Sequence, residues 1–138
     1  VTGPPTPEFQ DMLDIALEGY ERVAATLYVG KSSADSIAAA KFIHETGYDV
    51  YGGYLQGMLG ANPRHEPQIG PDRSTSAEDR FLYDSEGRLV YKHGMVFTLQ
   101  MHIIDRQKTR GVFLADTFAI LSSGPKCLNK FPPQMVRV

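Results

Sequence analysis

The sequence predicts an α+β domain in which two N-terminal helices pack on a curved antiparallel β-sheet. Three observations predict this class. Apolar residues recur with a helical period through the first 27 residues. A capping signal near residue 32 opens a second helix. The second half of the chain alternates apolar and polar residues, as half-buried strands do.

The first helix is expected to begin at Pro7, with Thr6 as its N-cap, because proline is favoured at the first helical position. The proline-rich lead-in before it cannot be helical. Apolar residues then stand at positions 9, 12, 13, 16, 17, 20, 23, 24 and 27, which holds a helical period for about five turns. We expect Leu13, Leu17 and Tyr20 to be buried on the face that meets the sheet.

The second helix is predicted to start after Ser32, with Asp35 completing a capping box and Gly47 ending the segment. Residues 48–60 mix tyrosines with glycines, so a strand and a short helix both remain open there. The stretch YGGYLQGMLG at 51–60 lacks the spacing of a dinucleotide fingerprint, and no GK[ST] follows it. Its glycines therefore indicate close packing rather than a phosphate cradle.

Residues 61–79 have the composition of a loop, since prolines at 63, 67 and 71 prevent regular pairing. A loop of this length is often functional, so we expect it to be the most mobile internal segment and a candidate lid.

The rest of the chain is predicted to be β-structure. Residues 80–92 are typical of a hairpin turning at Ser85–Gly87. The strand at 95–104 and the strand at 112–123 follow, joined by a charged turn, and the tail ends in a short edge strand at 134–138. We expect one domain over 1–138, with extended proline-rich segments at 1–7 and 124–133.

This order of elements resembles the cone-shaped folds of the cystatin and nuclear-transport-factor-2 (NTF2) type. The resemblance implies a sheet that curves over the first helix and encloses an apolar pocket with a few polar groups. The chain departs from that pattern because no early strand is evident between the helices.

The charge and the hydropathy of the sequence indicate which classes of binding partner are improbable for the protein. The net charge is −2 and Lys and Arg form no basic stripe, which argues against nucleic acid. No apolar stretch approaches the roughly 18 residues of a membrane span, and the single cysteine fits a reducing compartment. We therefore expect a soluble, cytoplasmic protein that binds a small molecule, with a homodimer through the sheet left open. The first residue, Val1, indicates a trimmed or processed N-terminus.

Asp116 is the most informative polar residue, because an unpaired acid within VFLADTFAIL costs several kcal/mol if buried. Its face depends on the register of the two long strands. If Asp105 pairs with Arg110, Asp116 joins Leu99 and Met101 on the apolar face. If the register slips by one residue, Asp116 lies opposite Gln100. The alternative to a functional role is a solvated face or a structural tie, because structural networks also place acids in sheets.

The sequence predicts a pocket with Asp116 as general acid or base and His102 as its partner in proton transfer. Four further residues are expected to orient a ligand: Tyr51, Tyr54, Thr98 and Gln100. Four histidines without tight spacing give no ligand set, so no metal and no cofactor are expected. The chemistry would be that of an isomerase, a cyclase or a dehydratase, that is, an isomerase or lyase. The alternative is a non-catalytic binding or assembly module of a larger complex.

Overall fold

The structure is a computed structural model, and it describes residues 3–57, 68–70 and 84–131. The first arm of the hairpin predicted at 80–92, nearly all of the predicted loop at 61–79 and the predicted edge strand at 134–138 lie outside the described residues. The mobility and lid role predicted for that loop therefore stay predictions.

The two predicted helices form, and the structure confirms the capping residues expected at their N-termini. Helix α1 spans Pro7–Ala24, and the hydroxyl of Thr6 accepts a hydrogen bond from the backbone N–H of Phe9 at 3.4 Å. Helix α2 spans Ser33–Ala40 and continues as the 3₁₀ helix η1 over Lys41–Glu45. The Asp35 carboxylate accepts from the backbone N–H of Ser32 at 2.8 Å, which completes the capping box. Gly47 follows η1 with φ +93°, a conformation that favours glycine.

The strands form one antiparallel sheet in the order β3–β2–β4–β5–β6, with β1 also paired to β4. The short strands are β1 (Asp49–Val50), β2 (Leu55–Gly57) and β3 (Gln68–Ile69), and the later ones are β4 (Val96–Ile104), β5 (Gly111–Leu121) and β6 (Gly124–Cys127). Of residues 48–60, left open between helix and strand, the described part therefore contributes strands β1 and β2. Strand β3 corrects the predicted loop at 61–79, because Gln68 and Ile69 pair with Gln56 and Leu55 of β2 despite the prolines on both sides. β4 and β5 are the long central pair, and their register runs from Val96↔Ala119 to Ile104↔Gly111.

Strand β6 corrects the prediction that the chain becomes an extended loop at residue 124. Glycine and proline there indicated a loop, but a tight turn sends the chain back along β5, with Leu121 opposite Gly124. Gly124 has φ +115°, which suits that turn. Pro125 is tolerated because β6 is an outer strand of the sheet in the described residues.

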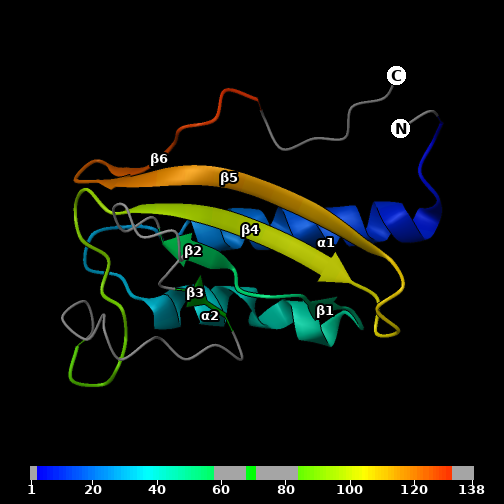
Figure 1. Ribbon diagram of the computed structural model, residues 1–138, viewed down its shortest axis with the longest axis horizontal. Helices are drawn as coiled ribbons and strands as arrows, with labels where there is room; N and C mark the ends of the chain where they lie inside the picture. Colours follow the sequence, from blue (N-terminus) through cyan, green and yellow to red (C-terminus); the bar gives the residue numbers. More distant parts are fainter. Residues whose placement is uncertain (1–2, 58–67, 71–83, 132–138) are drawn as a thin grey trace.

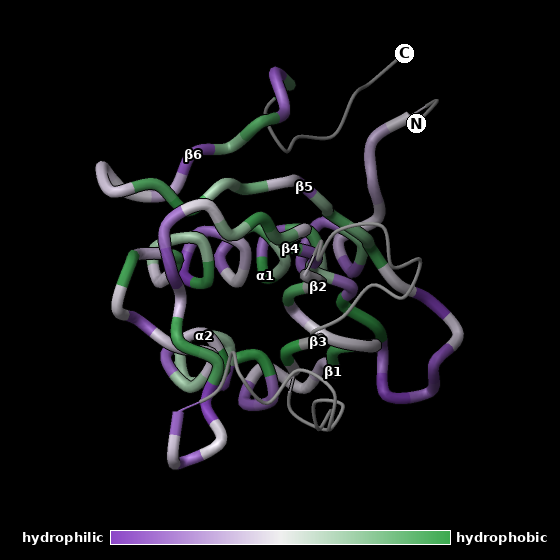
Figure 2. The backbone as a smooth tube through the Cα atoms, turned by 60° about the vertical axis from the view of Figure 1, so that its left-hand side comes forward, coloured by the Kyte–Doolittle hydropathy of each residue, from purple (hydrophilic) through white to green (hydrophobic). Residues whose placement is uncertain are grey.

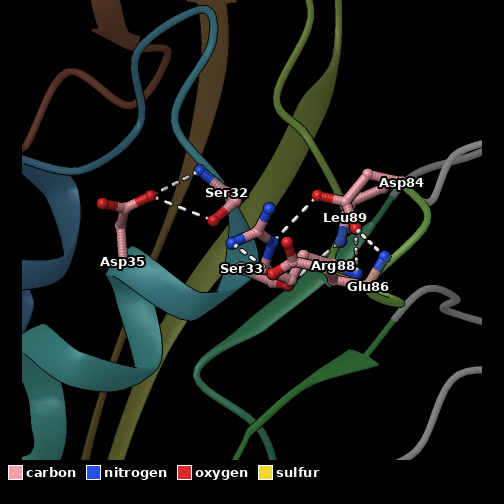
Figure 3. A network of polar contacts seen from close by, with 7 residues as sticks. All are labelled: Ser32, Ser33, Asp35, Asp84, Glu86, Arg88 and Leu89. Atoms are coloured by element: carbon pink, nitrogen blue, oxygen red, sulfur yellow. Dashed lines mark hydrogen bonds and ion pairs between the residues drawn. The ribbon is translucent and has the colours of Figure 1, made fainter.

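The predicted turn near Ser85–Gly87 is confirmed, and the Asp84 N–H donates to the Arg88 carbonyl across it at 2.9 Å. The Gly87 N–H donates to the carbonyl of Asp84 at 3.0 Å. The following residues bond to the start of α2: the Ser33 N–H donates to the Leu89 carbonyl at 2.8 Å, and the Leu89 N–H donates to the Ser33 hydroxyl at 3.1 Å. Figure 3 shows this network, which also holds Arg88 against the Asp84 carboxylate.

Both helices lie on one side of the long strands (Figures 1 and 2). α1 packs on β4 and β5, and the seven buried residues of α1 are Met12, Leu13, Ile15, Ala16, Gly19, Tyr20 and Val23. Leu13 and Tyr20 are buried as predicted, but Leu17 is only half-buried. The buried stripe is centred on Met12, Ala16 and Val23, each 0% exposed, so Leu17 lies at its margin. Within the described stretches, no helix is long and apolar enough to cross a membrane.

Candidate active site

The register of the two central strands decides which side chains share a face. Asp105 donates its backbone N–H to the Arg110 carbonyl at 3.1 Å, and Leu99 stands opposite Asp116. Asp116 therefore lies on the helix-covered face, the first of the two registers considered above. His102 stands opposite Phe113. It is three residues from Leu99 along β4, and side chains alternate between the two faces of a strand, so the His102 side chain projects from the other face. The proton-transfer pair predicted between Asp116 and His102 is not formed.

Asp116 instead has a partner from helix α1. Its Oδ2 accepts a hydrogen bond of 2.7 Å from the Tyr20 hydroxyl, and both side chains are buried. Burial raises the pKa of Tyr20 well above its usual value, and the bond to Asp116 adds to the rise. The ring of Tyr20 also contacts Phe118, with centroids 5.9 Å apart. This geometry is that of a structural tie between helix and sheet.

The opposite side of β4 and β5 carries the polar residues and is called the open face here. It is defined by Thr98, Gln100 and His102 on β4, and by Phe113 and Ala115 on β5. The three β4 residues are half-buried, whereas Phe113 and Ala115 are exposed. The sequence-predicted residues Thr98, Gln100 and His102 are thus brought together on one surface.

His102 lies between two aromatic rings on the open face. The Tyr51 ring centroid is 5.3 Å from that of His102, and the Phe113 centroid is 5.5 Å away, both in edge-to-face geometry. Tyr51 is 61% exposed and Phe113 is 56% exposed, so both rings also meet solvent. The Tyr51 N–H donates to the His102 carbonyl at 2.9 Å, which holds the two residues together.

Gln100 is fixed by the glycine segment. Its backbone N–H donates to the Tyr54 carbonyl at 2.8 Å, and its side-chain Nε2 donates to the Gly53 carbonyl at 3.0 Å. A Cβ on Gly53 would lie 2.9 Å from the carbonyl oxygen of Ile69, so only glycine allows this approach. The close-packing interpretation of the segment at 51–60 is confirmed for Gly53, while residues 58–60 lie outside the described residues.

The structure buries one predicted site residue and adds two residues that the sequence did not identify. Tyr54 was expected to orient a ligand, but it is 1% exposed and belongs to the core. Its neighbour Leu55 stands opposite Leu99 on the helix-covered face. Conversely, Phe113 and Tyr20 were not identified from the sequence. Phe113 would follow from the alternation of β5 once the register is known, whereas nothing in the sequence pairs Tyr20 with Asp116.

No group of three or more His, Cys, Asp or Glu side chains gathers closely enough to hold a metal ion among residues 3–57, 68–70 and 84–131. His44 contacts Asp49 at 3.6 Å, and His93 Nδ1 accepts from the Ser122 N–H at 3.1 Å. Neither histidine is among the residues that define the open face, and His102 is the single histidine of that set.

Comparison with known proteins supplies a family. Residues 1–122 match the model of metallopeptidase family M24. The prolidase from Thermococcus sibiricus superposes with a TM-score of 0.77 at 25% identity, over 100% of this chain and 34% of that one. The Xaa-Pro dipeptidase from Bacillus anthracis superposes with a TM-score of 0.74 at 22% identity, over 100% of this chain and 35% of that one. No curated protein matches the chain significantly.

These similarities correct the predicted cone. The methionine aminopeptidase from Rickettsia prowazekii also superposes, with a TM-score of 0.67 at 15% identity over 91% of this chain and 54% of that one. Prolidases and this aminopeptidase share the pita-bread fold, so the arrangement is not a cystatin or NTF2-like cone. Element order misled because both architectures place an antiparallel sheet over helices. The chain spans about a third of the length of the prolidase structures that it resembles.

The same findings correct the predicted chemistry. An isomerase or lyase without a cofactor was expected from the interior acid, but the matched family consists of metallopeptidases, which are hydrolases. The buried Asp116 misled because its tie to Tyr20 already accounts for an acid inside the sheet. With a family model matching 122 of its 138 residues, the chain belongs to metallopeptidase family M24.

Proposed function

We propose that the chain forms part of a peptidase that hydrolyses short peptides, with Xaa-Pro dipeptides as the first substrate class to test. The observation that carries the proposal is the family match over residues 1–122. The similarity at 25% identity to the prolidase from Thermococcus sibiricus supports Xaa-Pro dipeptides as the substrate class.

The open face is the surface on which we place the peptide. Its hydroxyl and amide groups, Thr98 and Gln100, can exchange hydrogen bonds with a peptide backbone. The exposed rings of Tyr51 and Phe113 flank His102, and proline-containing segments dock on surfaces lined by aromatic rings. The chain's own residues would bind and orient the peptide here.

A metal ion is implied by the family, and the described residues do not fit one. Protein sites for catalytic metals combine at least three His, Cys, Asp or Glu ligands, and the described part of the chain holds no such group. No hydrolytic step is therefore derived through a metal held by these side chains.

The proposal is tested by the release of free proline. The purified chain is incubated with Ala-Pro and with Ala-Ala, with and without added Zn²⁺, Mn²⁺ or Co²⁺, and the products are quantified by mass spectrometry. We expect proline to be released from Ala-Pro faster than in a sample without protein. Absence of hydrolysis of both peptides under every metal condition would contradict the proposal.

A matched pair of variants tests the role of the open face. Phe113→Ala removes an exposed ring of that face, and Phe131→Ala removes a ring that is 87% exposed elsewhere. We expect Phe113→Ala to raise KM for Ala-Pro and Phe131→Ala to leave it unchanged. Equal effects of the two variants would argue against peptide binding on the open face.

We also propose that the protein forms a homodimer through its sheet and is located in the cytoplasm. A homodimer through the sheet would use β6, an outer strand in the described sheet order, and light scattering of the purified protein would detect it. A cytoplasmic location is supported by a single cysteine, Cys127, and cell fractionation tests it.

A further inference from the structure

Within the described residues, the open face offers too few metal ligands for a member of a metallopeptidase family. Strands β4 and β5 together carry one carboxylate, Asp116, and it lies on the opposite face. The open face provides His102 as its nitrogen ligand, beside the neutral amide of Gln100 and the hydroxyl of Thr98. Transition metals in peptidases are held by carboxylates, imidazoles and thiolates rather than by amides and lone histidines.

The carboxylates near the open face, within the described residues, have other partners. Asp49 on β1 lies opposite Ile104, and its carboxylate contacts His44 Nδ1 at 3.6 Å. Asp116 is buried and accepts from the Tyr20 hydroxyl at 2.7 Å. Asp105 accepts from the Thr109 N–H and the Thr109 hydroxyl, each at 2.7 Å, within the turn between β4 and β5. Neither Asp116 nor Asp105 can reach the open face without breaking these bonds and reversing its strand register. Even with Asp49 counted, the described part of the chain brings no group of three or more His, Cys, Asp or Glu side chains together.

Two of the groups that remain on the open face already have neighbours in the structure. Gln100 uses Nε2 to bind the Gly53 carbonyl. The His102 ring contacts Tyr51 and Phe113 on its two sides, so its neighbours are rings rather than further ligands. We infer that the open face holds no transition-metal ion, and that a peptide lying on it is held by the amide, the hydroxyls and the rings alone.

The open face lacks carboxylates at two directly opposed positions, one on β4 and one on β5. Gln100 stands directly opposite Ala115 in the register, and His102 is the next open-face residue on β4. Side chains at directly opposed positions have Cβ atoms about 4.5–5.5 Å apart. Two carboxylates placed there would lie next to each other and beside His102, which is the kind of ligand group that the open face lacks.

Metal binding is therefore measured on four forms of the full chain: wild type, His102→Ala, the double variant Gln100→Glu with Ala115→Glu, and that double variant with His102→Ala added. Each is dialysed against a chelator, checked by circular dichroism, titrated with Zn²⁺ by calorimetry, and analysed for bound metal. We expect that the wild type binds no stoichiometric Zn²⁺ that the His102→Ala substitution would remove. We expect the double variant to bind about one ion per chain, and to lose it when His102→Ala is added.

Several outcomes decide the inference. Stoichiometric Zn²⁺ on wild type that His102→Ala removes would overturn it. Zn²⁺ on wild type that survives His102→Ala would support it, because the ion then lies outside the open face. A folded double variant that binds no Zn²⁺ would refute the argument from missing carboxylates, since geometry rather than ligand number would then exclude the metal.

The inference has two parts. The absence of a metal ion on the open face does not depend on the proposed peptidase function, whereas the binding of a peptide there rests on it. Calorimetry with Ala-Pro after chelation reads peptide binding without requiring hydrolysis. Binding that persists after chelation supports the inference, and binding that needs added Zn²⁺ and is lost in His102→Ala overturns it. Hydrolysis that fails while the metal results hold would count against the proposed function alone.

Discussion

The Tyr20 hydroxyl donates a 2.7 Å hydrogen bond to the Asp116 carboxylate, across 96 positions of sequence and between helix α1 and strand β5. The bond is buried, and it fixes the helix against the sheet at one point along their contact. It also gives a structural reason for an acid within an apolar strand.

Removal of the Tyr20 hydroxyl should destabilise the domain. Tyr20→Phe leaves a buried carboxylate without this donor, and we expect a loss of about 1–3 kcal/mol in the free energy of unfolding. Asp116→Asn keeps the shape and an accepting oxygen, so its cost should be smaller. Urea denaturation of both single variants and the double variant gives the coupling energy. Additive effects would show that the bond contributes nothing beyond its separate parts.

The free energy of unfolding should fall as the pH rises above about 10, the usual pKa of tyrosine. Burial raises the pKa of both Tyr20 and Tyr91 in the folded chain, with the Asp116 bond adding to the rise at Tyr20. The unfolded chain then loses protons at lower pH than the folded chain, so stability is complete below that pH and declines above it. Denaturation at increasing pH measures the slope. The variant with both Tyr20→Phe and Tyr91→Phe should show a smaller slope, and an unchanged slope would contradict the assignment.

The close approach at Gly53 predicts a site where an added methyl group is not tolerated. Gly53→Ala would place a Cβ 2.9 Å from the carbonyl oxygen of Ile69, so the loop must shift, at a cost of about 1–3 kcal/mol. Gly3→Ala is the matched control, because nothing lies within 4 Å of its added Cβ. Thermal unfolding should separate the two variants. Equal melting temperatures would mean that Gly53 and Ile69 are not in contact.

Core truncations along α1 should rank by burial rather than by sequence period. Met12 is fully buried, so Met12→Ala should cost about 2–5 kcal/mol. Leu17 is half-buried, so Leu17→Ala should cost clearly less. Denaturation midpoints of the two variants test this order. A larger loss for Leu17→Ala would indicate that α1 is rotated about its axis relative to the structure.

Local features were predictable because they depend on residues close together in the chain. The N-cap at Thr6, the capping box of Ser32 and Asp35, and the alternation of β4 each involve a few neighbouring positions whose preferences agree. The three polar residues of β4 were found in this way, since alternation alone puts them on one face.

The tertiary structure decided the rest, because it depends on pairings that local preference does not specify. A one-residue change of register would have moved Asp116 to the face of His102, and only the β4–β5 pairing excludes this. Backbone pairing with β5 made a strand at 124–127, where proline and glycine predicted a loop. The sequence by itself thus determined the helices, the long strands and the polar stripe of β4. The partner of Asp116, the aromatic neighbours of His102 and the burial of Tyr54 required contacts between segments far apart in the chain.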